Sequence, residues 1–247
     1  MKTTNESGHN QNVINFELLG TIIATFGPTY NPPKSTLAIP GLTELAEKGK
    51  LEINAVNTAE VVCNNAIAAR SNAFDDFDNT ITRIINALRI SGVSAQTLAQ
   101  AEAIVRDLRG KRASALLTEE QLAAEKEKGN DIKQVVVHNA TIDSKIENLS
   151  KLILFLETIP QYKPNESDLK LESLKEKLTD IKTKNTGLVA ADATLNAARR
   201  SRNEVLYADN EGLVDTALDV KLYTKSLFGA TSPQYKQISS IAFTKPR

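Results

Sequence analysis

Apolar residues recur every three to four positions along much of the chain. Steps of seven from Leu42 meet Gly49, Val56, Cys63, Arg70, Phe77 and Ile84, and steps of seven from Ala46 meet Ile53, Glu60, Ile67, Phe74, Ile81 and Leu88. A heptad pattern of this kind is typical of long helices that pack as in a coiled coil. It predicts one helix over 42–88, about 70 Å long at the standard helical rise. Gly49 and the Asn-rich stretch near Asn72 are the two places where such a helix could kink.

The second half of the chain repeats the pattern of the first half. Subtracting 132 from the residue numbers places Pro160, Tyr162 and Pro164 on Pro28, Tyr30 and Pro32, and it places Arg202 on Arg70. Each copy has an apolar helix, a Pro-x-Tyr-x-Pro connector that two prolines hold extended, a long helix, a glycine break and a shorter tail. The sequence therefore predicts an all-α fold, an elongated coiled-coil-like helical bundle built from two tandem related helical units.

Turn and capping residues predict the boundaries of these units. We expect a disordered leader over 1–12, a first helical unit over 13–112, a linker with a short helix over 113–131, and a second unit over 132–247, with both units packed as one bundle. Ser94 is expected to cap a helix that ends at Arg109, before Gly110, and Thr141 or Asp143 is expected to cap a helix that runs to about Thr158. Thr118 with Gln121 resembles a capping box, and the run 134–137 is either extended or part of the next helix.

The composition of the chain favours a helical fold, and its charge balance limits the classes of molecule that it is expected to bind. Apolar residues make up 41% of the chain but aromatic residues only 5%, which favours helices packed on aliphatic side chains. The 30 basic and 30 acidic residues balance, so the chain lacks the overall charge of a nucleic-acid-binding protein. One local exception is the basic segment Arg106, Arg109, Lys111 and Arg112. We interpret it as a helix C-terminus where cations oppose the helix dipole, with phosphate or RNA contact as the alternative.

Residues that carry chemistry are few. The chain has two histidines and one cysteine, and it contains no metal-binding or nucleotide-binding motif, so we expect no cofactor, no metal and no enzymatic activity. Cys63 is expected in the core, and the acidic residues Asp75, Asp76 and Asp78 on a solvated face.

Two arginines and two tyrosines are the structural candidates. Arg70 and Arg202 occupy the same position of the heptad pattern, where a buried guanidinium needs a partner. We expect ion pairs from Arg70 to Glu60, Asp75 or Asp76, and from Arg202 to Asp192 or Asp209; an anion-binding pocket and extension into solvent are the alternatives. Tyr30 and Tyr162 lie between connector prolines and are expected to pack on the end of the bundle, with ligand contact as the alternative.

Nothing in the sequence predicts secretion or a membrane span. The first residues lack the apolar region of a signal peptide, and no apolar stretch reaches the ~20 residues that cross a bilayer. A cytoplasmic location is therefore expected, and export by a non-classical route stays open. The segments Val13–Phe26 and Leu149–Ile159 are the most apolar, and we prefer core helices over membrane contact for both.

Several segments resemble a group of duplicated helical proteins of Bacteroidota that have no known activity. The segments are Ile159–Glu166, Asn203–Tyr207 and Lys225–Lys236 in the second half, and Thr82–Leu88 and Arg106–Arg112 in the first half. The resemblance implies helical structure and a bacterial source, and it assigns no function to any residue.

The sequence as a whole predicts a non-enzymatic structural or protein-interaction scaffold. Long amphipathic helices offer large lateral surfaces to a protein partner or to a second copy of the chain. Nucleic acid is not expected as a partner, and membrane contact is the less favoured reading. A membrane-active protein, for instance a pore component, is the alternative function.

Overall fold

The computed structural model of the chain describes residues 6–111, 118, 120, 126–128 and 141–246. Within these ranges every regular element is a helix and none is a β-strand, so the predicted all-α class is confirmed. The chain forms two compact units. Unit 1 comprises Met1–Asn65 with Val189–Arg247, and unit 2 comprises Ala66–Leu188.

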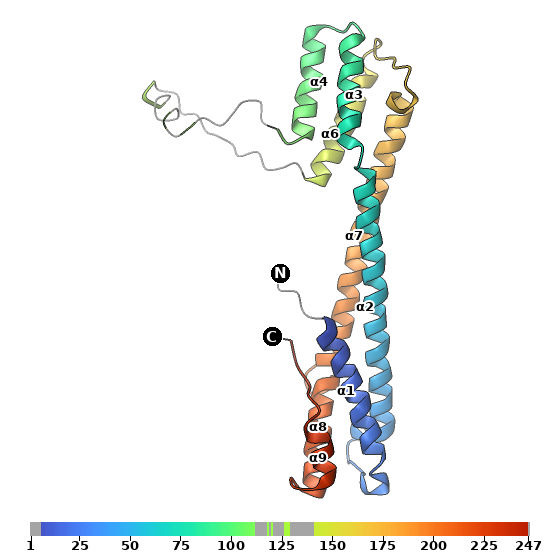
Figure 1. The fold of residues 1–247 in the computed structure, drawn as a ribbon, viewed down its shortest axis with the longest axis vertical. Coiled ribbons are helices and arrows are strands. Elements are labelled where there is room, and N and C mark those ends of the chain that lie inside the picture. Colours follow the sequence, from blue (N-terminus) through green and yellow to red (C-terminus); the bar gives the residue numbers. More distant parts are fainter. Residues whose placement is uncertain (1–5, 112–117, 119, 121–125, 129–140, 247) are drawn as a thin grey trace. The chain divides into compact units, whose positions relative to one another are not determined.

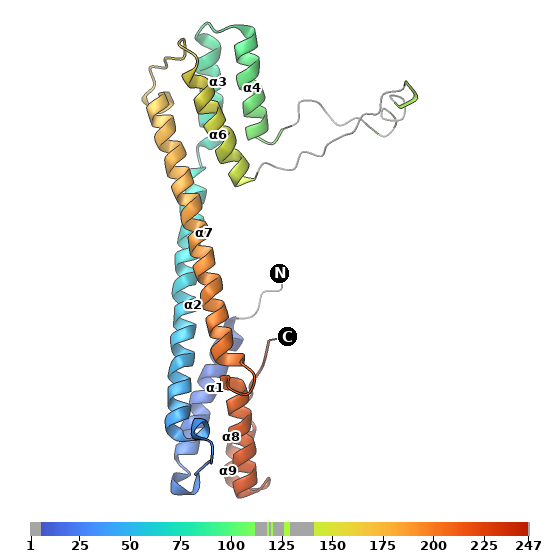
Figure 2. The ribbon, with the colours of Figure 1, turned by 180° about the vertical axis from the view of Figure 1, so that it is seen from behind.

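Unit 1 contains three complete helices and parts of two long ones. The complete helices are α1 (Glu6–Ala24), α8 (Leu213–Phe228) and α9 (Pro233–Ser239), and the long ones are α2 (Ile39–Ala73) and α7 (Leu171–Tyr207). Helix α8 packs against both α1 and α9, and both views show α1 beside the first part of α2 (Figures 1 and 2). Fully buried apolar side chains from these elements form one core, which includes Phe16, Leu19, Ile23, Leu42, Leu206, Leu213, Ala217 and Ile238.

Unit 2 is built around three shorter helices. These are α3 (Phe77–Ile90), α4 (Ala95–Leu108) and α6 (Ile142–Glu157); α4 packs on both of the others, and the remaining parts of α2 and α7 complete the unit. Its core is mostly aliphatic, and its fully buried members include Ile81, Ile84, Leu88, Leu108, Leu152, Leu156, Leu174 and Ile181.

Each unit combines helices from both halves of the chain. The ranges 13–112 and 132–247 predicted as units follow chain order, whereas unit 1 takes α1 from the first half and α8 and α9 from the second. Helices α2 and α7 each contribute to both units. The reason is geometric, because a helix of 35 residues is about 50 Å long and can pack its two ends on different neighbours.

The single helix predicted over 42–88 is interrupted, and this prediction is wrong in that respect. Helix α2 ends at Ala73 and α3 begins at Phe77, so the break lies next to Asn72, whereas Gly49 is a buried residue inside α2. Phe74 and Phe77 pack with ring centroids 5.1 Å apart at the break. The heptad positions from Leu42 to Val56 are buried as predicted, but Ile67 is 47% exposed.

Residues 6–12 are helical, which corrects the disordered leader predicted over 1–12. Helix α1 begins at Glu6, and the side chains of His9 and Asn12 are buried. Nδ1 of His9 lies 2.6 Å from the hydroxyl of Tyr207. Asn12 donates to the carbonyl oxygen of Thr244 at 2.7 Å and accepts from its N–H at 3.0 Å. These polar residues are ordered by partners about two hundred positions away, which no local pattern reveals.

The helix ends agree with the predicted caps. Ser94 caps α4 by accepting a hydrogen bond from the N–H of Thr97, and Thr141 caps α6 by accepting one from Ser144. Gly110 has a φ of 63°, the left-handed conformation expected just beyond the end of α4. The predicted run 134–137 lies outside the described residues, as does most of the linker with its short helix.

Replacing Gly187 by alanine should stabilise the protein by about 1 kcal/mol, the difference in helix propensity between the two residues. Gly187 lies inside α7, and a methyl group added there would meet no atom within 4 Å. Ala193 is exposed on the same helix and offers the reverse substitution as a matched control. Urea unfolding should show opposite shifts of similar size for Gly187→Ala and Ala193→Gly. If both substitutions lowered the stability, the fold would require glycine at position 187 for a reason other than helix propensity.

Candidate functional site

The two arginines on the heptad pattern have different surroundings. Arg70 is half-buried in unit 2, and its Nη1 donates to Oδ1 of Asn185 on α7 at 3.4 Å. In the part of the chain that the structure describes, Arg70 forms no ion pair with Glu60, Asp75 or Asp76. The expected ion pair is therefore replaced by a hydrogen bond between neighbouring helices.

Arg202 is 2% exposed in unit 1, and its Nε and Nη2 donate to Oδ1 of Asn203 at 3.1 and 2.9 Å. Of its two expected partners, Asp192 accepts a hydrogen bond from Asn196, and Asp209 pairs with Lys245 at 3.8 Å. The ion pair of Arg202 stays a prediction.

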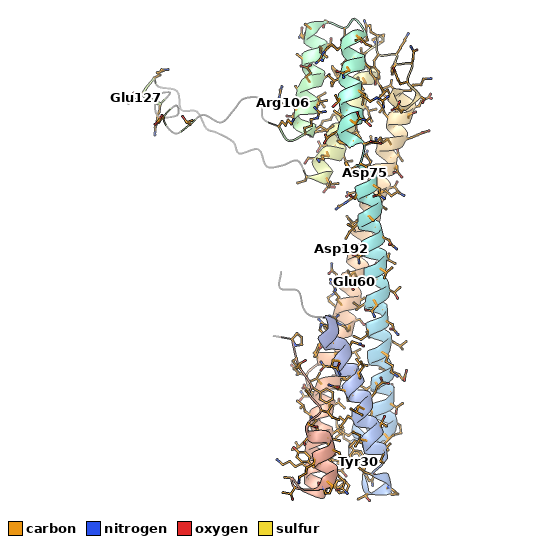
Figure 3. The ribbon with its side chains drawn as sticks, in the orientation of Figure 1. Tyr30, Glu60, Asp75, Arg106, Glu127 and Asp192 are labelled. Carbon is orange, nitrogen blue, oxygen red and sulfur yellow. The ribbon has the colours of Figure 1, made fainter. Side chains whose placement is uncertain are left out.

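Glu60 and Asp192 lie on α2 and α7, 132 positions apart (Figure 3).

Tyr30 and Tyr162 each close a connector. The hydroxyl of Tyr30 donates to the carbonyl oxygen of Leu37 at 3.0 Å, and that of Tyr162 donates to Leu169 at 2.9 Å. Both rings are buried, which raises the pKa of both phenols, that of Tyr162 to about 12. Each acceptor carbonyl ends a short 3-10 helix, Ser35–Leu37 in one connector and Ser167–Leu169 in the other. Both hydroxyls are thus engaged within the protein.

The described residues were also compared with what a metal site and a membrane-spanning helix require. Among the described residues, no set of three or more His, Cys, Asp or Glu side chains is placed to hold a metal ion. Cys63 is buried, and Asp75, Asp76 and Asp78 are exposed. No helix in the described ranges combines the length and the apolar character needed to cross a membrane.

A surface without charge runs along α2 within unit 1. Between positions 51 and 65, every fully exposed residue is uncharged, and the two glutamates of the segment, Glu52 and Glu60, are half-buried. Large apolar side chains are among the exposed ones: Leu51 is 66% exposed, Val61 59% and Val62 52%. In a chain with 24% charged residues, an exposed face of this kind is unusual.

The exposed residues share one side of the helix. Leu51, Ala55, Thr58, Val62 and Asn65 follow one another at intervals of four, three, four and three residues, the spacing of a coiled-coil seam. We call these five residues the outer stripe of α2. At about 100° per residue the mean direction of the stripe is about 135° away from that of the buried residues of the same segment, which are Ile53, Val56, Ala59 and Cys63. The predicted heptad pattern covers the buried seam and not this second one, although the spacing of the second seam is visible in the sequence.

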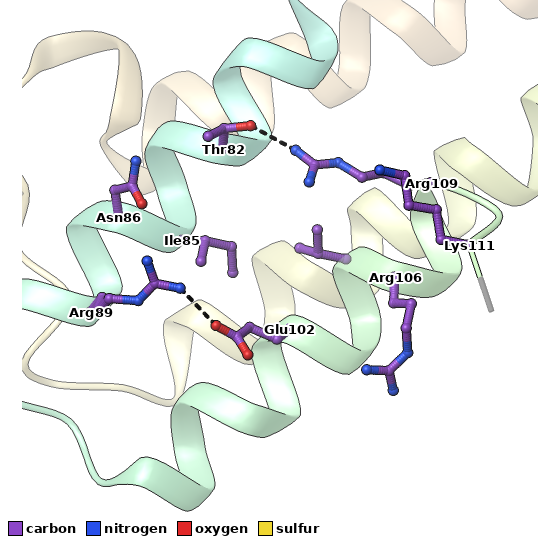
Figure 4. A pocket seen from close by; sticks show the side chains of 9 residues that line it. Thr82, Ile85, Asn86, Arg89, Glu102, Arg106, Arg109 and Lys111 are labelled. Carbon is purple, nitrogen blue, oxygen red and sulfur yellow. Dashed lines mark hydrogen bonds and ion pairs between the residues drawn. The ribbon is translucent and has the colours of Figure 1, made fainter. Parts of the chain in front are cut away.

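A basic cleft of about 350 Å³ lies between α3 and α4 in unit 2 (Figure 4). Arg106, Arg109 and Lys111 from the predicted basic segment line it, and Arg89 from α3 joins them. Arg112, the fourth residue of that segment, lies outside the described residues. Arg89 was not predictable from the sequence as part of this cleft, because its contribution depends on how α3 and α4 pack.

No family model, no curated protein and no solved structure matches this chain. The resemblance to helical proteins of Bacteroidota stays a prediction.

Proposed function

We propose that this protein is a non-enzymatic helical scaffold that associates with a second copy of itself through the outer stripe of α2. The observation that carries the proposal is the complete absence of charge among the exposed residues of the described segment 51–65, together with the exposure of Leu51 and Val62 within the stripe. Burying each of these apolar side chains would contribute on the order of 1 kcal/mol. An interface would thus remove the cost of their exposure to water.

A second copy fits this stripe better than a charged partner does. An isologous dimer places the same patch of both chains in contact, so the patch must be complementary to itself. Like charges facing one another would oppose this arrangement, and the stripe has none. Its heptad spacing lets side chains interlock along a helix pair, and the hydroxyl of Thr58 and the amide of Asn65 can donate and accept hydrogen bonds across it.

We also propose that the scaffold arose by duplication of one helical unit and that its bundle is elongated. The two connectors support the duplication. The 3-10 helices that begin at Ser35 and Ser167, and the long helices that begin at Ile39 and Leu171, are each separated by the same 132 residues. Each connector also has the same hydrogen bond from its tyrosine to the carbonyl two positions before its long helix.

Light scattering after size-exclusion chromatography tests the self-association. The wild-type chain should be dimeric at about 100 μM, a concentration that would saturate an association of micromolar Kd. Val62→Lys places a charge in the middle of the stripe and should shift the protein to a monomer, because the charge would lose its hydration in the interface. Circular dichroism should show unchanged helix content, since Val62 is more than half exposed.

Val189→Lys is the matched control for this experiment. Val189 lies on α7 in unit 1 and is 63% exposed, so the same substitution is made at a similar exposure outside the outer stripe. This variant should remain dimeric. A wild-type protein that is monomeric at every concentration would overturn the proposal, and equal dissociation of both variants would overturn the assignment to α2.

A further inference from the structure

The basic cleft of unit 2 has an excess of positive charge that its own acidic residues do not neutralise. Among the described residues that line it, four are cationic and one, Glu102, is a carboxylate, which pairs with Arg89 at 2.9 Å. Asp78 lies at the rim with its side chain 80% exposed, and its Oδ1 is 3.7 Å from Nε of Arg109. In the described part of the chain, no carboxylate pairs with Arg106 or Lys111. The cleft therefore presents at least two uncompensated cations.

Two of the arginines are held in place by the protein. Arg89 is fixed by Glu102, whereas Nη2 of Arg109 donates to the hydroxyl of Thr82 at 2.7 Å and to the carbonyl oxygen of Asp78 at 3.2 Å. Figure 4 shows Thr82 and Arg109 on facing helices with this bond between them. Arg109 is only 25% exposed, so it loses little conformational freedom when a ligand binds.

The end of α4 positions the two remaining cations. The N–H of Lys111 donates to the carbonyl oxygen of Arg106 at 2.9 Å, and that of Gly110 donates to Asp107 at 3.0 Å. This pair of bonds, with Gly110 in the left-handed conformation, is a Schellman motif. It brings the backbone of Lys111 back beside Arg106, and both residues line the cleft, with the guanidinium of Arg106 pointing away from Thr82 in this structure (Figure 4). The helix C-terminus attracts cations by its dipole, but the dipole alone does not require a cleft with further cations from α3.

We infer that this cleft binds a small phosphorylated compound that carries two or more negative charges. Guanidinium groups bind phosphate oxygens through paired N–H donors, and Lys111 adds a point charge. Ile85 and Val105 are buried in the cleft lining, so its base is apolar and can contact the organic part of such a compound. A volume of about 350 Å³ suits one small molecule, at the lower end of the range for ligand pockets.

Isothermal titration calorimetry with the full chain tests this inference, with inorganic pyrophosphate and phenyl phosphate as probes at constant ionic strength. Binding of at least one probe is expected. Arg106→Gln/Lys111→Gln should weaken it by about a hundredfold, since each charge-assisted hydrogen bond lost costs about tenfold in affinity. Neither side chain makes a hydrogen bond or ion pair in the described structure, so the variant should keep the thermal stability of the wild type.

Lys170→Gln/Lys182→Gln removes the same charge from exposed positions of unit 2 outside the cleft, and it should change the affinity less than about twofold. Absence of binding by both probes would overturn the inference. An equal loss in both double variants would also overturn it, because the effect would then reflect net charge.

Tighter binding of a glutamate-rich peptide of equal charge would assign the cleft to an acidic protein segment and overturn the phosphate assignment. The variant Val62→Lys changes α2 in unit 1 and leaves the cleft in unit 2 unchanged. Its effect on dimerisation therefore tests the proposed self-association independently of ligand binding in the cleft.

Discussion

Gly49→Leu should destabilise the protein by about 3 kcal/mol, the upper end of the cost of overpacking a core. Gly49 is buried in α2, and a Cβ added there would lie 3.2 Å from Cγ2 of Val13 and 3.2 Å from Cδ1 of Leu213. Val13 is 2% exposed and Leu213 is 0% exposed, so neither has free space to move into. Chemical denaturation followed by circular dichroism measures the change.

Gly187→Leu is the matched control, because the same side chain on α7 would meet no neighbour within 4 Å of its Cβ. It should raise stability slightly through helix propensity. Gly49→Ala should lie between the two, since a gain of about 1 kcal/mol in propensity is opposed by the tight contacts of one methyl group. If Gly49→Leu unfolded at the wild-type denaturant concentration, the packing of α1 and α8 around Gly49 would be wrong.

Tyr162→Phe should cost about 1–3 kcal/mol, because it leaves the buried carbonyl oxygen of Leu169 without its donor. Tyr30→Phe should cost a similar amount, since its hydroxyl donates to Leu37 in the same way. The ring stays in both variants, so apolar burial is unchanged and thermal unfolding reports the hydrogen bond. Tyr235→Phe offers a control, because the half-buried Tyr235 packs on the core of unit 1 and its hydroxyl makes no hydrogen bond in the described structure. If Tyr235→Phe lost as much stability as the other two variants, the loss would be a general effect of removing a tyrosine hydroxyl and not of the connector hydrogen bonds.

The same tyrosine predicts a loss of stability at alkaline pH. Burial, helped by the nearby negative charges of Glu166 and Asp168, raises the pKa of Tyr162 from 10.0 to about 12. The folded state therefore holds the phenolic proton more tightly than the unfolded state does. This contribution is complete below pH 10 and is lost as the pH rises from 10 to about 12. Melting temperatures of the wild type should fall over this range, and those of Tyr162→Phe should fall less. Parallel curves would contradict the pKa shift.

Features that depend on near neighbours were predictable from the sequence. The caps Ser94 and Thr141 and the turn at Gly110 follow from the hydrogen-bonding and backbone preferences of these residues. The buried positions of α2 from Leu42 to Val56 follow from the helical period. Asn72 was one of two predicted places for a break in the long helix, and Gly49 was the other. The helical period of apolar residues could not distinguish between these places, because Gly49 also interrupts the pattern.

The candidate surfaces were predictable only in part. The basic segment after Arg106 is visible in the sequence, but the cleft also needs Thr82 and Arg89 from another helix. The outer stripe of α2 has a spacing that the sequence displays. Its exposure was not predictable, because a helix with two apolar seams can bury either or both.

Local chemistry in the sequence determined that this protein is helical, where most of its helices end, and that its two connectors share one pattern. The grouping of helices into two compact units was decided by the tertiary structure alone. So were the burial of His9 and Asn12 and the position of the break in the long helix, next to Asn72 and not at Gly49. The physical reason is that a helix forms from interactions within a few residues, whereas burial depends on which surfaces meet. In this chain, the hydrogen-bond partners of His9 and Asn12 lie about two hundred residues away.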